Sequence, residues 1–137
     1  MKEYGVKLSD KGLLIELVER KEGESVLNFC YRVIGCDTID IVNPKGLEQP
    51  YCMVVDDEGL LKDKPMLNVF ASHLYGAYEY GHAIVGNAVL MKNERDVDGM
   101  QTVWLTKDEA ASLAANLGNS VLRAVADLNA AIRKGVL

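Results

Sequence analysis

The fold is decided by residues 54–90, which read VVDDEGLLKDKPMLNVFASHLYGAYEYGHAIVGNAVL. An apolar run leads into an acidic turn at residues 56–59, after which Leu60-Leu61 is expected to pair back as the second arm of a hairpin. A helix is predicted from Pro65 to Gly81, because apolar residues recur there at spacings of three and four: Leu67, Phe70, Ala71, Leu74 and Ala77. Residues 83–92 then read as a strand.

The residues before this stretch contain three further strands and a helix. Residues 12–21 (GLLIELVERK) are predicted to form a strand that is buried on most of both faces. A short amphipathic helix is expected at residues 26–34, with Ser25 as its N-cap and Gly35 as its stop. Two short strands follow at residues 38–42 and 51–55, joined by a proline-containing turn, and their hairpin-like arrangement favours antiparallel pairing.

The residues after this stretch read as a hairpin followed by a long helix. The strand at 83–92 is expected to pair with residues 101–105, and a Thr106–Glu109 capping box starts a helix at Lys107. The inner face of this helix carries a heptad seam: Ala110, Ala114, Leu117, Val121, Ala124, Leu128 and Ala131.

The length of this helix raises two alternatives. A continuous helix to Lys134 would run about 42 Å, whereas a domain of this size has a radius of gyration of about 14 Å. Either the helix breaks at Gly118, or its outer part projects and the seam packs on a second subunit. We take packing on the chain's own sheet as the default. A homo-oligomer through Leu117, Val121, Ala124 and Leu128 is the alternative.

The expected architecture is therefore a single α+β domain over residues 1–137. Its core, at about residues 12–105, is an antiparallel or mixed sheet with two short helices. A long or broken C-terminal helical region occupies residues 107–134.

Composition limits the functional classes. Fifteen basic against 20 acidic residues leave a net charge of −5 without any basic cluster, which disfavours direct binding to nucleic acid. No run approaches the ~18 apolar residues of a membrane span, so no membrane partner is expected. Three cysteines and a start without an apolar signal segment indicate reduced thiols and a cytoplasmic location.

Metal and cofactor motifs are weak in this sequence. The acidic residues Asp56 and Asp57 could ligate a cation, but Asp and Gly are also the ordinary residues of a tight turn. Together with the tyrosine helix, this acidic turn is expected to form the surface that binds a ligand or partner. Residues 94–99 imitate the start of a calcium loop, yet Leu105 stands where the bidentate Glu is required. Phosphate-loop, dinucleotide and zinc-protease signatures are absent, so neither a metal nor a cofactor is expected.

Tyrosines and histidines form the densest group of candidate binding residues. Tyr75, Tyr78 and Tyr80 gather on the predicted helix, with Tyr75 and Tyr78 on adjacent turns of one face, where rings either pack inward or contact a ligand or partner. His73 and His82 lie beside them, but neither belongs to a recognised catalytic motif, so no catalytic residue is assigned. A hydrolase that combines one histidine with Asp56 or Asp57 is the enzymatic alternative.

Several of these segments resemble a domain-of-unknown-function family of small proteins from phages, prophages and conjugative elements of Gram-positive bacteria. The resemblance covers about residues 12–105, and rests on residues 34–42, an Asp-Glu-Gly turn at 57–59, a Pro65-x-x-Asn68 helix start and an Ile-x-Gly-Asn-Ala strand at 84–88. It assigns no catalytic residue. What it implies is a non-enzymatic accessory protein of a mobile element, which acts by binding a host defence protein or a small signalling nucleotide.

Overall fold

The protein is described from a computed structural model that covers residues 2–12 and 14–135, without the side chains of Tyr78, Ala124, Val125 and Leu128. Its centre is an antiparallel sheet of six strands in the order β2-β1-β5-β4-β3, with β6 paired to β5. The strands are β1 (Tyr4–Leu8), β2 (Ile15–Glu19), β3 (Ile39–Val42), β4 (Tyr51–Asp56), β5 (Ala88–Asp96) and β6 (Gly99–Val103).

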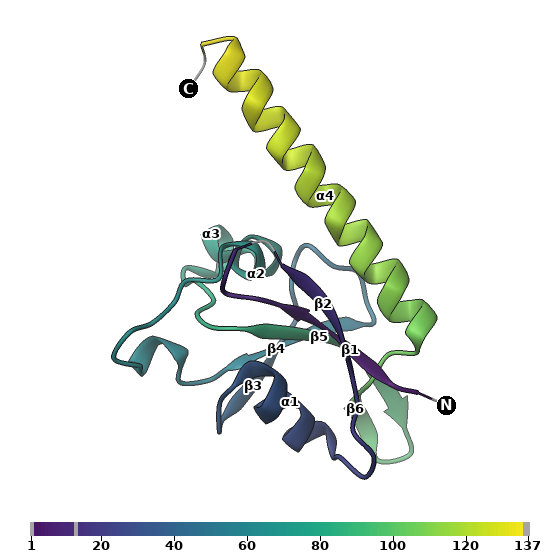
Figure 1. The fold of residues 1–137 in the computed structure, drawn as a ribbon. Helices are drawn as coiled ribbons and strands as arrows, with labels where there is room; N and C mark the ends of the chain where they lie inside the picture. Colours follow the sequence, from purple (N-terminus) through teal and green to yellow (C-terminus); the bar gives the residue numbers. More distant parts are fainter. Residues whose placement is uncertain (1, 13, 136–137) are drawn as a thin grey trace.

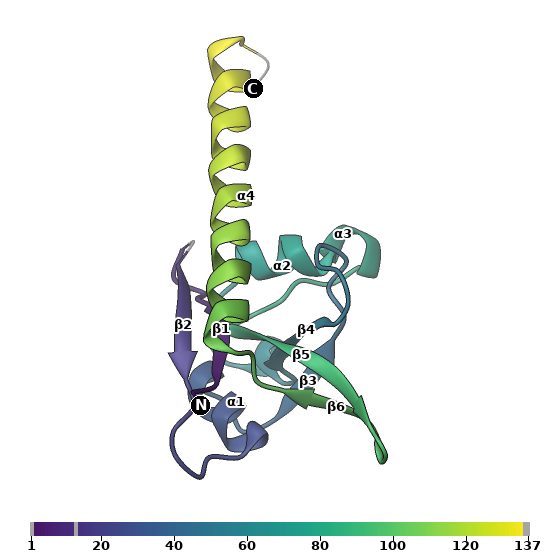
Figure 2. The same ribbon diagram turned by 90° about the vertical axis from the view of Figure 1, so that its right-hand side faces the viewer.

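Helices cover both faces of this sheet, which confirms the predicted α+β class (Figures 1 and 2). They are α1 (Val26–Ile34), α2 (Val69–Tyr75), α3 (Ala77–Tyr80) and α4 (Lys107–Arg133), with a short 3₁₀ turn, η1, at Gly59–Leu61. One core cluster, built around Phe29, Cys30 and Val89, lies under α1. The other contains Leu90 and Leu113 and lies under α2 and the first half of α4.

The strand β1 was not predicted, although it lies between β2 and β5 near the middle of the sheet. Its sequence contains Gly5, and glycine weakens a strand pattern when no neighbouring strand is known. The structure supplies the reason for the glycine, because a Cβ there would come within 2.8 Å of Val89 and 2.9 Å of Phe29. Close packing against the sheet and α1 therefore requires glycine at this position.

The strand predicted at residues 12–21 was too long and too buried. Of the described residues in this segment, which exclude residue 13, those from Ile15 to Glu19 form β2, and Leu14 and Leu17 are exposed. The strand lies at the edge of the sheet, where one side pairs with β1 and the other side has no neighbour in the strand order. An edge position leaves side chains open to solvent that a central strand would bury.

The predictions for α1 and for the two hairpins are confirmed. Ser25 Oγ accepts a hydrogen bond from the Asn28 N–H, and Gly35 ends the helix at φ +83°. The strands β3 and β4 pair antiparallel, as do β5 and β6. The strand β5 begins at Ala88 instead of residue 83, after Gly86 takes a φ of +84° that a regular strand cannot contain.

Two predictions within residues 54–90 were wrong. Leu60 and Leu61 do not form a second hairpin arm but belong to η1, and both are exposed. The single helix from Pro65 to Gly81 is two helices, since Asn68 caps α2 and Gly76, at φ +94°, ends it. A glycine in the left-handed backbone conformation ends one helix and turns the chain toward the next.

The long helix α4 is continuous through Gly118 and projects beyond the body (Figure 1). Its predicted capping box is present, with the Glu109 N–H donating to Thr106 Oγ1 at 3.2 Å and Thr106 N–H donating to the Glu109 carboxylate at 2.9 Å. Ala110, Leu113 and Leu117 are buried against the sheet. At 1.5 Å per residue its 27 residues span about 40 Å. Val121 still packs against the core cluster, and the C-terminal part of the helix rises away from the sheet (Figure 2).

Candidate functional site

A cavity of about 130 Å³ lies where the ends of β3 and β4 meet the segment at residues 82–85. We call it the turn cavity, because the turn at residues 56–59 forms one side of it. Its lining residues are Asp40, Val42, Val55, Asp56, Asp57, Gly59, Leu60, His82, Ala83, Ile84 and Val85. Three predicted site residues, Asp56, Asp57 and His82, are thus brought together, whereas His73 is exposed on α2 and is not among the lining residues.

A second pocket, of about 150 Å³, lies on the other side of the same turn and shares Asp56, Gly59 and Val85 with the turn cavity. We call it the lysine pocket after two of its lining residues. The remaining lining residues are Asp10, Ile34, Gly35, Lys62, Lys64, Pro65, Met66, Gly86 and Asn87. Seven of its 12 lining residues stand in the segments that carry the family resemblance: Ile34, Gly35, Gly59, Pro65, Val85, Gly86 and Asn87.

The turn between the two pockets is held by a buried carboxylate. Asp56 Oδ1 accepts the Glu58 N–H at 2.9 Å, and Asp56 Oδ2 pairs with Lys62 Nζ at 2.9 Å, while its side chain is only 4% exposed. The bond to Asp56 raises the pKa of Lys62. Asp56 therefore orders the turn and has its charge balanced within the fold.

Gly59 allows the turn to pack closely against the segment before β5. A Cβ at this position would lie 2.9 Å from the Val85 carbonyl oxygen, closer than packed atoms approach. This glycine is therefore required by contact between the two walls that the pockets share.

Asn68 joins three segments behind the lysine pocket. Its Oδ1 accepts the Ala71 N–H at 3.0 Å, and its Nδ2 donates to the Leu8 carbonyl at 3.0 Å and to the Gly86 carbonyl at 2.9 Å. The side chain is buried, so these groups depend on it for their hydrogen bonds. The Pro-x-x-Asn motif is accordingly a folding element.

Asn87 has a similar structural role beside the lysine pocket. Its Oδ1 accepts the Asp10 N–H at 3.0 Å, and its Nδ2 donates to the Ile34 carbonyl at 3.3 Å. It ties the end of α1 to the turn that follows β1. The Gly-Asn pair of the resemblance therefore shapes the pocket wall.

The aromatic cluster differs from the predicted one. The rings of Tyr75 and Tyr80 stack at 4.5 Å, and the Tyr75 hydroxyl lies 3.0 Å from His82 Nε2. The Tyr80 hydroxyl donates to the Asn43 carbonyl at 3.3 Å. The break at Gly76 prevents the expected pairing of Tyr75 and Tyr78 on one continuous helix face, and the Tyr78 side chain lies outside the described part of the structure.

Burial divides this cluster into a structural and an accessible part. Tyr75 is buried, which raises the pKa of its hydroxyl, whereas Tyr80 and His82 are exposed. Lys45 packs over the Tyr80 ring, with Nζ 4.7 Å from the ring centroid, and forms an ion pair with Glu79. His82 is therefore the link between the tyrosine cluster and the turn cavity.

The described residues give no support to a metal site or to a reactive cysteine thiol at Cys30. Within residues 2–12 and 14–135, no three His, Cys, Asp or Glu side chains are placed to hold a metal ion together. The calcium-like segment forms the β5–β6 turn, where Asp96 Oδ1 accepts the Asp98 N–H at 2.7 Å. Burial raises the pKa of the Cys30 thiol to about 12, which disfavours a reactive thiolate there.

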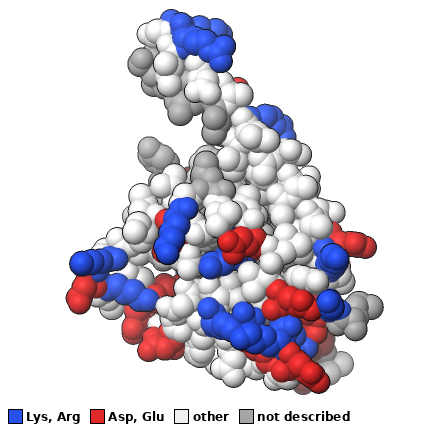
Figure 3. All heavy atoms as spheres, viewed as in Figure 1, with Lys and Arg blue, Asp and Glu red and all other residues white. Residues whose placement is uncertain are grey.

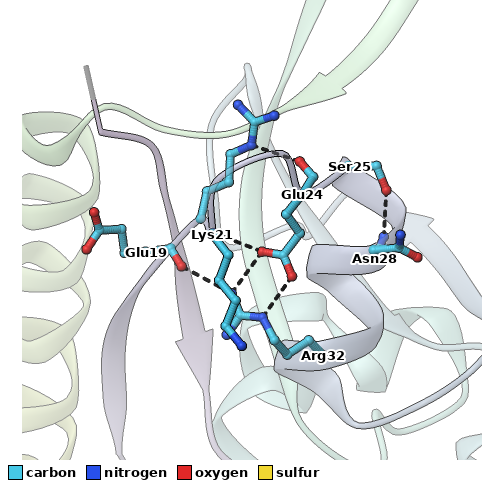
Figure 4. Close-up of polar contacts among 7 residues, drawn as sticks. Glu19, Lys21, Glu24, Ser25, Asn28 and Arg32 are labelled. Carbon is cyan, nitrogen blue, oxygen red and sulfur yellow. Dashed lines mark hydrogen bonds and ion pairs between the residues drawn. The ribbon is translucent and has the colours of Figure 1, made fainter.

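A second polar cluster connects β2 to α1, away from the pockets (Figure 4). The Glu24 carboxylate accepts hydrogen bonds from Arg32 Nε at 2.8 Å and Arg32 Nη2 at 2.9 Å, and from the Lys21 N–H at 3.1 Å. Arg20 Nε donates to the Glu24 carbonyl at 2.8 Å, and its guanidinium lies 4.2 Å above the Trp104 ring. The hydrogen bond from Arg32 is the main cause that lowers the pKa of Glu24 to about 2.

Charges of both signs are interspersed over the face of the molecule that Figure 3 shows. Figure 3 shows acidic and basic side chains alternating on the face in view, with most of α4 uncharged. On this face the mixture differs from the continuous basic surface that nucleic-acid backbones require. No helix in the described residues is long and apolar enough to cross a membrane.

Comparison with known proteins places the chain in a family. The model described as Domain of unknown function (DUF3846) matches residues 7–117. The chain belongs to this family. No curated protein and no solved structure matches the chain. The DUF3846 match extends beyond the predicted residues 12–105 and ends at Leu117, the last core residue of α4, so it covers both pockets.

Four charged residues of the pockets were missed from the sequence: Asp40 in the turn cavity, and Asp10, Lys62 and Lys64 in the lysine pocket. Asp40 interrupts an otherwise apolar β-branched strand, which was a usable signal for an exposed functional face. The two lysines lie in a polar loop, and only the fold shows that this loop borders a pocket. The local sequence pattern therefore predicted the turn at residues 56–59, but not the residues from other segments that line the pockets beside it.

Proposed function

We propose that the protein acts by binding a partner protein, as an accessory protein of a phage or related mobile element. The observation that carries this proposal is a group of exposed apolar side chains around the two pockets: Leu60, Leu61, Met66 and Leu67. Leu60 lines the turn cavity and Met66 lines the lysine pocket. We call these four residues with the two pockets the turn face. An apolar rim around small recesses suits a protein partner.

The sizes of the turn cavity and the lysine pocket favour a protein over a small signalling nucleotide as their occupant. Small-molecule sites enclose about 300–1,000 Å³, whereas the two pockets measure about 130 and 150 Å³. Recesses of this size suit single side chains. A nucleotide phosphate in the turn cavity would also meet the carboxylates of Asp40 and Asp57.

The biological setting of the proposal comes from the resemblance to phage and mobile-element proteins. Asn68, Asn87 and Gly59 shape the turn face through their hydrogen bonds and close packing. A small folded protein that binds through one such exposed face is suited to neutralise another protein. We propose a host defence protein as the partner, which makes this chain a cytoplasmic counter-defence factor.

Leu60→Arg is expected to abolish partner binding without unfolding the chain. The immobilised full chain is used to capture proteins from a Gram-positive lysate, and Leu60→Arg should retain at least tenfold less of the captured protein than the wild type. Met100→Arg is the matched control, because Met100 is 57% exposed against 61% for Leu60 but lies on β6. Equal retention by both variants, or failure of the wild type to protect a phage from any defence system, would contradict the proposal.

A second candidate function is a hydrolase, favoured by the presence of His82 and Asp57 in one cavity. A general base must lie within hydrogen-bond reach of the proton it removes. The described contact of the His82 ring is instead with the Tyr75 hydroxyl, at 3.0 Å. Turnover of an ester or phosphodiester that His82→Gln abolishes would favour this candidate over binding.

The projecting part of α4 supports a further proposal, that the chain forms a homo-oligomer. Leu117 is buried in its own core, so the seam available to a second copy begins at Val121, which packs against this core with part of its surface and is only partly buried. The predicted seam residues Ala124 and Leu128 lie outside the described side chains. Leu122 and Ile132, also on this part of the helix, are exposed.

Val121→Asp is expected to reduce the oligomer to a 15.0 kDa monomer in light scattering, because a charge in the seam would have to be desolvated on association. Asn119→Asp, at an exposed polar position of the same helix outside the predicted seam, is the control and should leave the mass unchanged. A circular dichroism melt establishes that both variants stay folded. A wild-type chain that is already monomeric at 100 μM, or equal dissociation by both variants, would exclude the oligomer.

A further inference from the structure

The turn cavity has apolar walls and an acidic mouth. Its walls are formed by aliphatic side chains from β3, β4, η1 and the segment before β5: Val42, Val55, Leu60, Ile84 and Val85. Val55, Ile84 and Val85 belong to the buried core, so the cavity reaches between core residues. Its polar side chains are three aspartates and His82. This arrangement matches a ligand with an aliphatic stem and a polar end.

The charge at the mouth is negative. Asp56 is balanced by Lys62 at 2.9 Å, which leaves the carboxylates of Asp40 and Asp57, both exposed, as the remaining acidic groups of the lining. Of the described lining residues, His82 is the only other one with an ionisable side chain. The cavity should therefore attract a cation and repel an anion.

The size of the cavity and the placement of its ligands identify the kind of cation. The described residues offer no group of three His, Cys, Asp or Glu side chains that could hold a metal ion together, which disfavours a divalent metal. A volume of about 130 Å³ has room for one long side chain. A guanidinium can form bonds with more than one carboxylate through its fork of N–H donors, while its methylenes pack on aliphatic walls.

We propose that the turn cavity receives an arginine side chain of the partner protein, with its stem along Val55 and Ile84 and its guanidinium between Asp40 and Asp57. This inference rests on the proposed function and names the chemistry of the partner at the turn face. The exposed Leu60 then packs against apolar groups that flank the arginine. A basic anchor among apolar contacts is a recurrent feature of interface centres.

The test uses a small arginine probe and its neutral isostere. The ¹⁵N-labelled full chain is titrated with acetyl-Gly-Arg-Gly-amide in 20 mM salt, and amide shifts are followed by NMR. We expect saturable shifts at Leu60, Ala83 and Ile84, with Kd on the order of 1 mM for so small a probe. The citrulline peptide, which has nearly the same shape without the charge, should bind at least fivefold more weakly. Equal binding of both peptides would overturn the proposal.

Isosteric variants locate the binding site. Asp40→Asn and Asp57→Asn together should weaken the arginine peptide at least fivefold, whereas Asp98→Asn, at the exposed β5–β6 turn, should not change Kd. Shifts that persist unchanged in the double variant would also overturn the proposal. If Leu60→Arg abolishes partner capture while Asp40→Asn/Asp57→Asn does not, the proposed function stands and the arginine site is excluded. If neither abolishes capture, both fail.

Discussion

Replacing Asn68 with alanine is expected to lower the free energy of unfolding by about 3 kcal/mol. The substitution removes the N-cap of α2, which is typically worth about 1 kcal/mol. It also leaves the carbonyls of Leu8 and Gly86 without the Nδ2 donor, at a cost of about 1–3 kcal/mol for buried groups. The side chain is 1% exposed, so water cannot replace these bonds without a rearrangement.

Urea denaturation measures this loss. Asn119→Ala is the control, because Asn119 is an exposed polar residue on α4 and its replacement should change stability by less than about 0.5 kcal/mol. A loss below about 1 kcal/mol for Asn68→Ala would mean that the segments before α2 and β5 are held mainly by other contacts. It would remove the reason to regard the Pro-x-x-Asn motif as a folding element.

Glu24→Gln is expected to destabilise the chain by about 2 kcal/mol at pH 7 and to remove part of its acid sensitivity. The pKa of Glu24 is lowered from 4.5 to about 2, chiefly by the hydrogen bond from Arg32. A lowered folded-state pKa stabilises the fold above about pH 4.5, and this contribution is lost as the pH falls toward 2. The full shift corresponds to about 3 kcal/mol, which we reduce because Arg32 is 32% exposed.

The pH dependence is read from urea midpoints at pH 7, 4.5 and 2.5. The wild type should lose stability relative to Glu24→Gln between pH 4.5 and pH 2.5, so that the two curves converge. Glu22→Gln, at an exposed neighbouring position, is the control and should follow the wild type throughout. Parallel curves for wild type and Glu24→Gln would show that the Glu24–Arg32 pair contributes no stability.

Local signals were sufficient wherever a few neighbouring residues determine the structure. The Ser25 cap, the Gly35 stop and the Thr106–Glu109 box were predicted because a cap bonds to amides two or three residues away. The two confirmed hairpins also follow from short-range turn chemistry. The α+β class could be predicted from these elements alone.

The failures concern contacts between distant segments. Gly5 reads as a strand breaker until Val89 and Phe29, from other elements, are known to pack against it. The edge position of β2 likewise depends on β1, which was not predicted. Gly76 reads as a tolerable interruption of a helix, because its positive φ is visible only in the backbone.

The candidate site was predicted in part for the same reason. Asp56, Asp57 and His82 were selected from the sequence, but the turn cavity that unites them depends on the packing of β3 against β4 and of Gly59 against Val85. Asp40 entered the site only through that pairing. Asp56 and Asp57 were expected to form a tight turn and also to belong to the binding surface. Asp56 is held within the turn by Glu58 and Lys62, whereas Asp57 is exposed among the lining residues of the cavity.

The central claim, that the turn face contacts a partner protein, is tested most directly by site-specific photocrosslinking. The photoreactive residue p-benzoylphenylalanine is placed at Leu60 or, as the control, at Met100, in the full chain expressed in infected Gram-positive cells. We expect irradiation to join one discrete host protein to the chain labelled at position 60 and not to the chain labelled at position 100. Crosslinks to that protein from position 100 alone, or equally from both, would contradict a binding site at the turn face.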